Sequence, residues 1–166
     1  YLMSRGYQVD GVEPEVKARE QAIANHGISV VPTMERLPNR EHYQVVTMWH
    51  ALEHVPDVRA TLKRIFALLA DNGLLVIAVP DRESWDARYY GAYWAAWDVP
   101  RHLSHFRRAD ILRLLHEHGF DVLETRRMWL DALYISLLSE RYRGAGAIAS
   151  FLLGSIRGTW SNFRSL

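Results

Sequence analysis

A continuous apolar run, Leu74 to Pro80, is the feature of the sequence that most constrains its fold. A strand with apolar side chains on both faces must be covered on both sides, as the strands of parallel sheets are. Expected strands and helices alternate ahead of this run, with strands at 7–13, 28–32 and 43–49 and helices at 14–27 and 57–70. This alternation predicts a doubly wound α/β domain, with a mostly parallel sheet and helices on both faces.

The second half of the sequence is expected to be mostly helical. Asp57 should cap the helix at 57–70, and the Asp71-Asn72-Gly73 triplet should end it. Further helices are expected at 108–118 and 130–142, with a strand at 120–126 between them. Residues 144–166 are small, apolar and interspersed with arginine, and their apolar core at 147–156 is too short to span a bilayer.

We expect two parts in this chain. The first is a domain at 1–128, which includes an insertion at 84–106 directly after the buried strand, and the second is a helical extension at 129–166. Gly6 has the character of a helix stop, but five preceding residues are too few for a stable helix. The domain is therefore expected to be incomplete at its N-terminus.

Composition excludes several functional classes. The 166 residues include 20 basic and 19 acidic ones, a formal charge of +1, so bulk charge does not indicate a nucleic-acid partner. The sequence has no cysteine, which excludes disulfides and thiolate metal sites. Because no apolar stretch reaches the length of a transmembrane helix, a cytoplasmic protein is expected.

Glu13 ends the first expected strand and is followed by Pro14. In open parallel sheets, ligands bind beyond the carboxyl ends of the strands, and an acid there can accept hydrogen bonds from both hydroxyls of a ribose. The alternative is an acid that stabilises the start of the next helix. The residue pattern alone leaves both open.

Residues 47–57 place two histidines and a glutamate directly after a strand. His50, Glu53 and His54 match the H-x-x-E-H pattern of zinc peptidases, but that pattern functions on a sustained helix. A strand up to Trp49 and a proline at 56 argue against such a helix. A second interpretation is that Glu53 and His54 hold a turn together by hydrogen bonds.

The insertion at 84–106 is rich in aromatic residues and lies over the expected ligand crevice. Such rings can attract cations, including sulfonium and quaternary ammonium groups, and exclude water, or they can form a small core beneath a loop. His102 and His105 follow them, and a loop histidine can accept a proton from a substrate hydroxyl. The aromatic residues concerned are Trp85, Tyr89, Tyr90, Tyr93, Trp94 and Trp97.

Four segments together resemble the class I S-adenosylmethionine-dependent methyltransferases, and most closely the branch with the ubiquinone-biosynthesis O-methyltransferases. The resemblance covers residues 1 to about 128 in the family's order and implies a Rossmann-like sheet. The segments are 9–13 (VDGVE), 45–57 (VVTMWHALEHVPD), 69–80 (LADNGLLVIAVP) and 100–106 (PRHLSHF).

The resemblance implies roles for individual residues around S-adenosylmethionine. Glu13 would bind the ribose beside Pro14, and the loop of Thr33, Met34 and Glu35 would lie next to the adenine. Three further residues would line the methionine and sulfonium side of the pocket: Met48, Trp49 and His50. The family's glycine-rich loop would belong to a strand upstream of the first residue.

The resemblance also bears on metal binding. In quinone O-methyltransferases this neighbourhood can hold a divalent metal through two glutamates and a histidine. Glu53 and His54 match that set, but His50 stands at its first position. We therefore predict no metal and keep Glu53 and His54 as the nearest candidates.

The predicted function is methyl transfer from S-adenosylmethionine, leaving S-adenosylhomocysteine, to a small-molecule acceptor, with oxygen as the expected nucleophile. The candidate base is His102 or His105, with His54 third. A non-catalytic binding or regulatory domain of the same fold and a nicotinamide-dependent oxidoreductase are the alternatives. The apolar tail suggests peripheral membrane contact, although a short interface helix would have the same composition.

Overall fold

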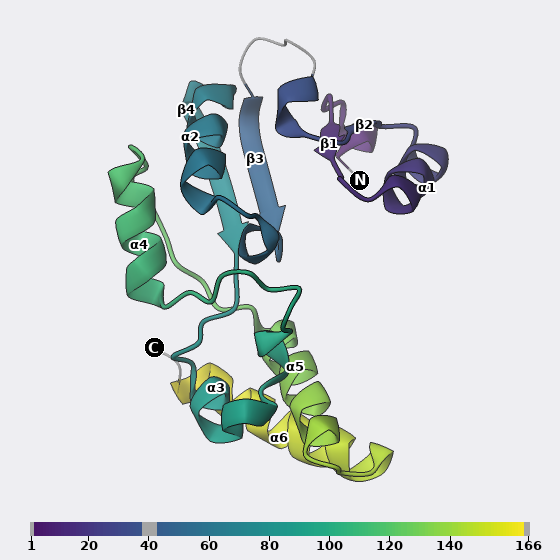
Figure 1. The fold of residues 1–166 in the computed structure, drawn as a ribbon, viewed down its shortest axis with the longest axis vertical. Helices are drawn as coiled ribbons and strands as arrows, with labels where there is room; N and C mark the ends of the chain where they lie inside the picture. Colours follow the sequence, from purple (N-terminus) through teal and green to yellow (C-terminus); the bar gives the residue numbers. More distant parts are fainter. Residues whose placement is uncertain (1, 38–42, 165–166) are drawn as a thin grey trace. The chain divides into compact units, whose positions relative to one another are not determined.

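The computed structural model describes residues 2–37 and 43–164, and it divides the chain into two compact units (Figure 1). The first unit ends at Tyr43 and the second begins at Gln44. The first contains β1 (Asp10–Val12), α1 (Val16–His26) and β2 (Ser29–Val31), with single 3-10 turns at Met3–Arg5 and Met34–Arg36. The second contains β3 (Tyr43–Trp49), α2 (Val58–Leu68), β4 (Leu69–Ala78), α3 (Trp85–Tyr90), α4 (Arg108–Glu117), α5 (Trp129–Tyr142) and α6 (Ala147–Arg164), with 3-10 turns at Leu52–His54, Gly91–Tyr93 and Ala95–Trp97.

The first unit is a strand–helix–strand motif with the expected parallel pairing. Asp10 pairs with Ser29 and Val12 with Val31. Helix α1 begins later than predicted because the Glu15 carboxylate, and not a group before Pro14, accepts the N–H of Ala18 at 2.5 Å and caps the helix. It ends as predicted before Gly27, whose φ of 62° suits glycine.

The second unit is built around β3 and β4, which pair and run in the same direction (Figure 1). Strand β3 has the predicted bounds, and Asp57 caps α2 as predicted by accepting the N–H of Ala60 at 2.9 Å. Leu52, Leu62 and Phe106 form the centre of a core to which α4 contributes its apolar face. The described strands thus form two two-stranded sheets, one in each unit.

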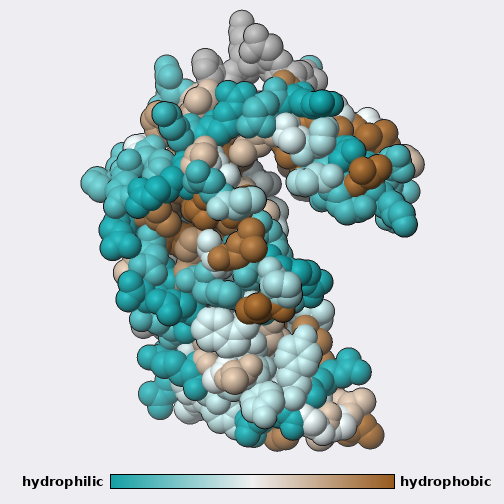
Figure 2. All heavy atoms as spheres, in the orientation of Figure 1, coloured by the Kyte–Doolittle hydropathy of each residue, from teal (hydrophilic) through white to brown (hydrophobic). Residues whose placement is uncertain are grey.

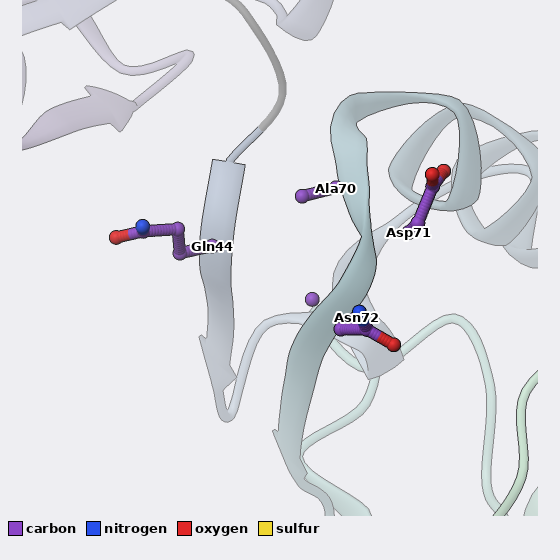
Figure 3. Close-up of a pocket in the computed structure, with 5 residues that line it drawn as sticks. Gln44, Ala70, Asp71 and Asn72 are labelled. Carbon is purple, nitrogen blue, oxygen red and sulfur yellow. The ribbon is translucent and has the colours of Figure 1, made fainter.

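Two predicted boundaries in the second unit are wrong. Helix α2 ends at Leu68, and the Asp71-Asn72-Gly73 triplet lies inside β4 instead of ending the helix, because Leu69 already adopts an extended backbone (ψ 147°). The triplet lines an open hollow with Gln44 and Ala70 at the starting ends of β3 and β4 (Figure 3). The strand expected at 120–126 is absent, since no described strand supplies the ladder partner that a strand needs.

Helices α3, α5 and α6 pack together around a small aromatic core. Tyr90 and Trp94 are buried in it with Ala87 and Ala96. This part of the insertion therefore forms the small core beneath a loop that was the alternative to a cation-binding aromatic surface. A polar seam joins α3 to its neighbours. Its hydrogen bonds are Trp94 Nε1 to Asp86 (2.8 Å), Ser161 Oγ to Asp86 (2.6 Å) and Tyr90 Oη to Glu140 (2.8 Å), and Arg157 pairs with the same Glu140.

Gly154 allows α6 to approach α5 closely. A Cβ atom at this position would lie 2.6 Å from the Cα atom of Leu137, closer than any real contact. We predict that Gly154→Ala lowers the free energy of unfolding by about 1–3 kcal/mol, because backbone must move to relieve the overlap. Chemical denaturation would measure it.

Gly146→Ala is the matched control, because a Cβ atom there would meet nothing within 4 Å. Equal stability of the two variants would contradict the close approach of α5 and α6.

Candidate functional site

The polar side chains of the second unit gather where β3 and β4 end. His50 follows β3, its N–H donates to the Ala78 carbonyl at 3.0 Å, and its φ is +48°. Positive φ is uncommon for a residue other than glycine and turns the chain sharply away from the strand. The next residues form a single 3-10 turn, Leu52–His54, with Leu52 fully buried as its anchor.

This turn excludes the zinc-peptidase interpretation. A 3-10 turn of three residues is not the sustained helix that H-x-x-E-H requires, and its two histidines have different partners. His50 Nε2 lies 2.6 Å from an Asp131 carboxylate oxygen on α5, whereas His54 Nδ1 donates to the Arg101 carbonyl at 2.9 Å.

His50 lies between two carboxylates. Its Nδ1 atom is 3.4 Å from Glu53 Oε1, and its Nε2 atom contacts Asp131. The close Glu53 carboxylate, opposed by partial burial and supported by Asp131, raises the pKa of His50 to about 9. The imidazole is therefore a cation at neutral pH and joins the end of β3 to α5.

Glu53 is the most constrained residue of the site. Its side chain is 1% exposed, and neither carboxylate oxygen accepts a hydrogen bond from a described residue, although His50 Nδ1 lies 3.4 Å from Oε1. Its backbone carbonyl accepts N–H donors from Leu103 (2.8 Å) and Ser104 (3.1 Å). The turn and the loop that carries His102 are thus held together at this residue.

His102 points its Nε2 atom at this buried carboxylate. Its Nδ1 donates to the Ala96 carbonyl at 2.8 Å, which orients the ring and leaves Nε2 as the proton acceptor of the neutral form. Nε2 lies 3.9 Å from Glu53 Oε1 and 3.8 Å from Asp98 Oδ2. An oriented imidazole beside carboxylates can accept a proton, because they stabilise the cation that forms.

The other two candidate histidines lie beside His102. The His54 ring meets it edge-on, with ring centroids 4.7 Å apart, and is exposed. The His105 ring is 6.1 Å away and donates from Nε2 to the Trp97 carbonyl at 2.7 Å. The structure therefore brings all three together, with Nε2 of His102 directed toward Glu53.

Glu53, His54 and His102 are the residues that could hold a metal. One ligand atom from each lies within 4.8 Å of the others, and two imidazoles with a carboxylate suit a divalent transition metal. In both histidines the Nδ1 donates to a backbone carbonyl, as it commonly does in metal ligands. His50, which stands at the first ligand position implied by the resemblance, is bound to Asp131 instead.

Met48 and Trp49 precede this cluster at the end of β3. Met48 packs against the core of Leu52, Leu62 and Phe106, whereas Trp49 is exposed. Their predicted contact with the methionine part of the cofactor stays a prediction.

The remaining predicted site residues lie in the first unit. Glu13 is half-buried, its N–H donates to the Val31 carbonyl at 2.9 Å, and its Oε1 atom accepts the N–H of Glu15 at 2.9 Å. Pro14 beside it is exposed. Because β1 and β2 are parallel, Glu13 and the 33–35 loop lie at the same edge of their sheet. A carboxylate can accept further hydrogen bonds, so the Glu15 contact is compatible with a ribose-binding role.

Sequence reasoning missed Asp98 and Asp131. Asp98 adopts a left-handed backbone (φ 38°), which Asp tolerates and which its place before Val99-Pro100 could have suggested. Asp131 lies in an ordinary helical stretch, and nothing local in the sequence distinguishes it.

A family model described as a methyltransferase domain matches residues 1–125. A curated "Ubiquinone biosynthesis O-methyltransferase" of Rhodopseudomonas palustris (strain HaA2) is 28% identical and covers 83% of this chain and 57% of its own length. A protein of the same name from Bradyrhizobium diazoefficiens is 32% identical over 60% of this chain and 43% of its own. The chain spans about half the length of these relatives.

A solved structure from Thermotoga maritima also resembles this chain. It is described as an SAM-dependent methyltransferase and a possible histamine N-methyltransferase. The two are 26% identical, with a TM-score of 0.57, over 68% of this chain and 55% of the other. The doubly wound, Rossmann-like α/β fold expected from the sequence is thereby confirmed.

The raised pKa of His50 predicts how stability depends on pH. Protonation in the folded state contributes stability that is fully present below the unfolded pKa of 6.5 and is lost as pH rises through about 9. We expect His50→Asn, which tolerates the positive φ, to cost about 1 kcal/mol at pH 6, since the half-exposed ring is screened by water. Urea denaturation at several pH values would measure this.

Wild type and the His50→Asn variant should converge in stability near pH 10. A difference that does not change with pH would show that His50 acts through packing and not through its charge.

Proposed function

The chain belongs to the methyltransferase-domain family, and we propose on that basis that the protein transfers a methyl group from S-adenosylmethionine to a hydroxyl group of a small molecule. The names of the curated relatives favour oxygen as the acceptor atom. The structural observation that carries this proposal is the oriented His102 ring beside the buried Glu53 carboxylate, at the end of the strands where such folds bind ligands.

Methyl transfer is an in-line displacement at carbon. The acceptor oxygen forms a bond to the methyl carbon as the carbon–sulfur bond breaks, and that electron pair stays on sulfur. The hydroxyl proton must leave, and His102 Nε2 accepts it. Glu53 and Asp98, at 3.9 and 3.8 Å, stabilise the imidazolium that forms.

We propose that the donor is held by the residues that the resemblance implies. Glu13 would accept the ribose hydroxyls, and Thr33, Met34 and Glu35 would border the adenine. Glu13 and this loop follow neighbouring parallel strands, which supports their joint role. Met48, Trp49 and His50, at the end of β3, would line the methionine and sulfonium side of the pocket. The two carboxylates beside His50 would offset the charge of its imidazole there.

Glu53, His54 and His102 would also be the ligands of a divalent metal in this protein. A metal held there would acidify a coordinated hydroxyl and take over the task that we assign to His102. The mechanism above requires no metal.

Replacing Glu13 by Ala should weaken binding of S-adenosylmethionine by about 1–3 kcal/mol, the usual effect of losing charge-assisted hydrogen bonds. Titration calorimetry would measure it. Glu20→Ala, an exposed acid on α1, is the matched control.

The same titration separates the alternatives. Unchanged affinity in Glu13→Ala would remove Glu13 from the ribose site. Binding of NAD⁺ in place of S-adenosylmethionine would indicate an oxidoreductase, and binding of neither would indicate a domain without catalysis.

Replacing His102 by Gln should lower kcat about 10²- to 10³-fold, because the proton acceptor is gone. Steady-state kinetics would measure this loss. His116→Gln, an exposed histidine on α4, should behave like wild type.

Activity should persist in a chelator if His102 is the base. Loss of activity in the chelator that a divalent metal restores would contradict His102 as the base. It would indicate instead that a metal held by Glu53, His54 and His102 activates the acceptor hydroxyl.

A further inference from the structure

The hairpin formed by α5 and α6 has its polar side chains inside. The α5 residues that are buried are Ser136, Ser139 and Glu140, and those of α6 are Ser150, Gly154, Gly158, Ser161 and Asn162. A helix of a water-soluble domain normally buries its large apolar residues and exposes its polar ones. The distribution here is the reverse.

The large apolar residues of the same helices lie outside. Ile148 is 79% exposed and Ile156 67%, and both lie on the outer face of α6. Figure 2 shows a few hydrophobic (brown) atoms at the lower right of this view, where the α5–α6 hairpin turns in Figure 1. Further exposed large apolar residues of the two helices include Leu130 and Tyr134 on α5 and Phe151, Leu152, Trp160 and Phe163 on α6.

Backbone proximity and polar contacts hold the hairpin together. A Cβ atom at Gly154 or Gly158 would lie 2.6 Å from the Cα atom of Leu137 or Leu133. Asn162 Nδ2 donates to the Trp129 carbonyl at 3.1 Å, across from one helix to the other. Small residues four apart and interhelical hydrogen bonds are how helices associate in apolar surroundings, where burying large side chains gives no advantage.

The charges near this apolar face indicate what it contacts. From residue 141 onward the sequence has no acid, and its charged residues are Arg141, Arg143, Arg157 and Arg164. Arg141, Arg143 and Arg164 are exposed. Arginine beside an apolar helix face, with Trp160 at the same helix, is the composition of helices that lie at the surface of an anionic bilayer.

The length of the helices determines how they can meet a bilayer. None of the helices in the described part of the chain is long and apolar enough to cross a membrane.

A second copy of the chain fits this apolar face less well than a membrane does. Pairing two copies would bring their arginines together, and residues 141–166 contain no acid to neutralise them.

We propose that the α5–α6 hairpin docks on the surface of membranes that contain anionic phospholipids. The outer face of α6 enters the boundary between headgroups and acyl chains, and the exposed arginines contact the lipid phosphates. The inference concerns lipid binding, is independent of methyl transfer and goes beyond the function proposed above.

Vesicle flotation tests this proposal. We expect wild type to float with vesicles of phosphatidylcholine and about 30% phosphatidylglycerol, and to bind vesicles of phosphatidylcholine alone at least about tenfold more weakly. The double variant Phe151→Ser/Ile156→Ser should bind anionic vesicles at least about tenfold more weakly than wild type. Leu123→Ser, which removes an exposed leucine outside the hairpin, is the matched control.

Three outcomes would overturn the proposal. The first is that wild type does not float with anionic vesicles. The second is that Leu123→Ser loses vesicle binding to the same extent as the double variant. The third is that wild type does not bind vesicles and sediments as a dimer, whereas the double variant sediments as a monomer. Thermal unfolding and S-adenosylmethionine binding of each variant, measured without lipid, separate these outcomes from misfolding and from failure of the methyl-transfer proposal.

Discussion

The buried Glu53 is the residue on which the site depends. Its carbonyl accepts two N–H donors from the loop that carries His102, and its side chain contacts the His50 cation, which in turn pairs with Asp131 on α5. One residue thereby connects the end of β3, the loop that carries His102 and helix α5. Without compensation, a buried carboxylate that accepts no hydrogen bond would be costly, and the neighbouring His50 cation supplies that compensation.

The fold was predictable where local chemistry decides the structure. The bounds of β3, the Asp57 cap and the Gly27 stop follow from β-branched runs, a capping carboxylate and a left-handed backbone. The wrong predictions occur where pairing with a distant strand decides the structure. The triplet Asp71-Asn72-Gly73 has the residues of a turn, but it continues a strand. Residues 120–126 have the composition of a strand, but no strand in the described part of the chain pairs with them.

The candidate site was predictable only in part, for a similar reason. His54, His102 and His105 could be named because they follow strand ends or lie in a loop beside them. Asp131 could not, because its contact with His50 spans 81 positions of sequence and no periodicity records it. The face of α6 that packs against the protein could not be predicted either. Its periodicity shows one stripe of large apolar residues and one of small residues, but it does not show which of the two is buried.

The contact between the turn at Ala95–Trp97 and helix α5 has a consequence for the site. Ser139 on α5 accepts the N–H of Ala95 at 2.9 Å, and the carbonyl of the next residue, Ala96, orients the ring of His102. A displacement of α5 would therefore move the main chain that orients the His102 ring. Any contact on the outside of the hairpin that shifts α5 would, through these two hydrogen bonds, also shift this imidazole.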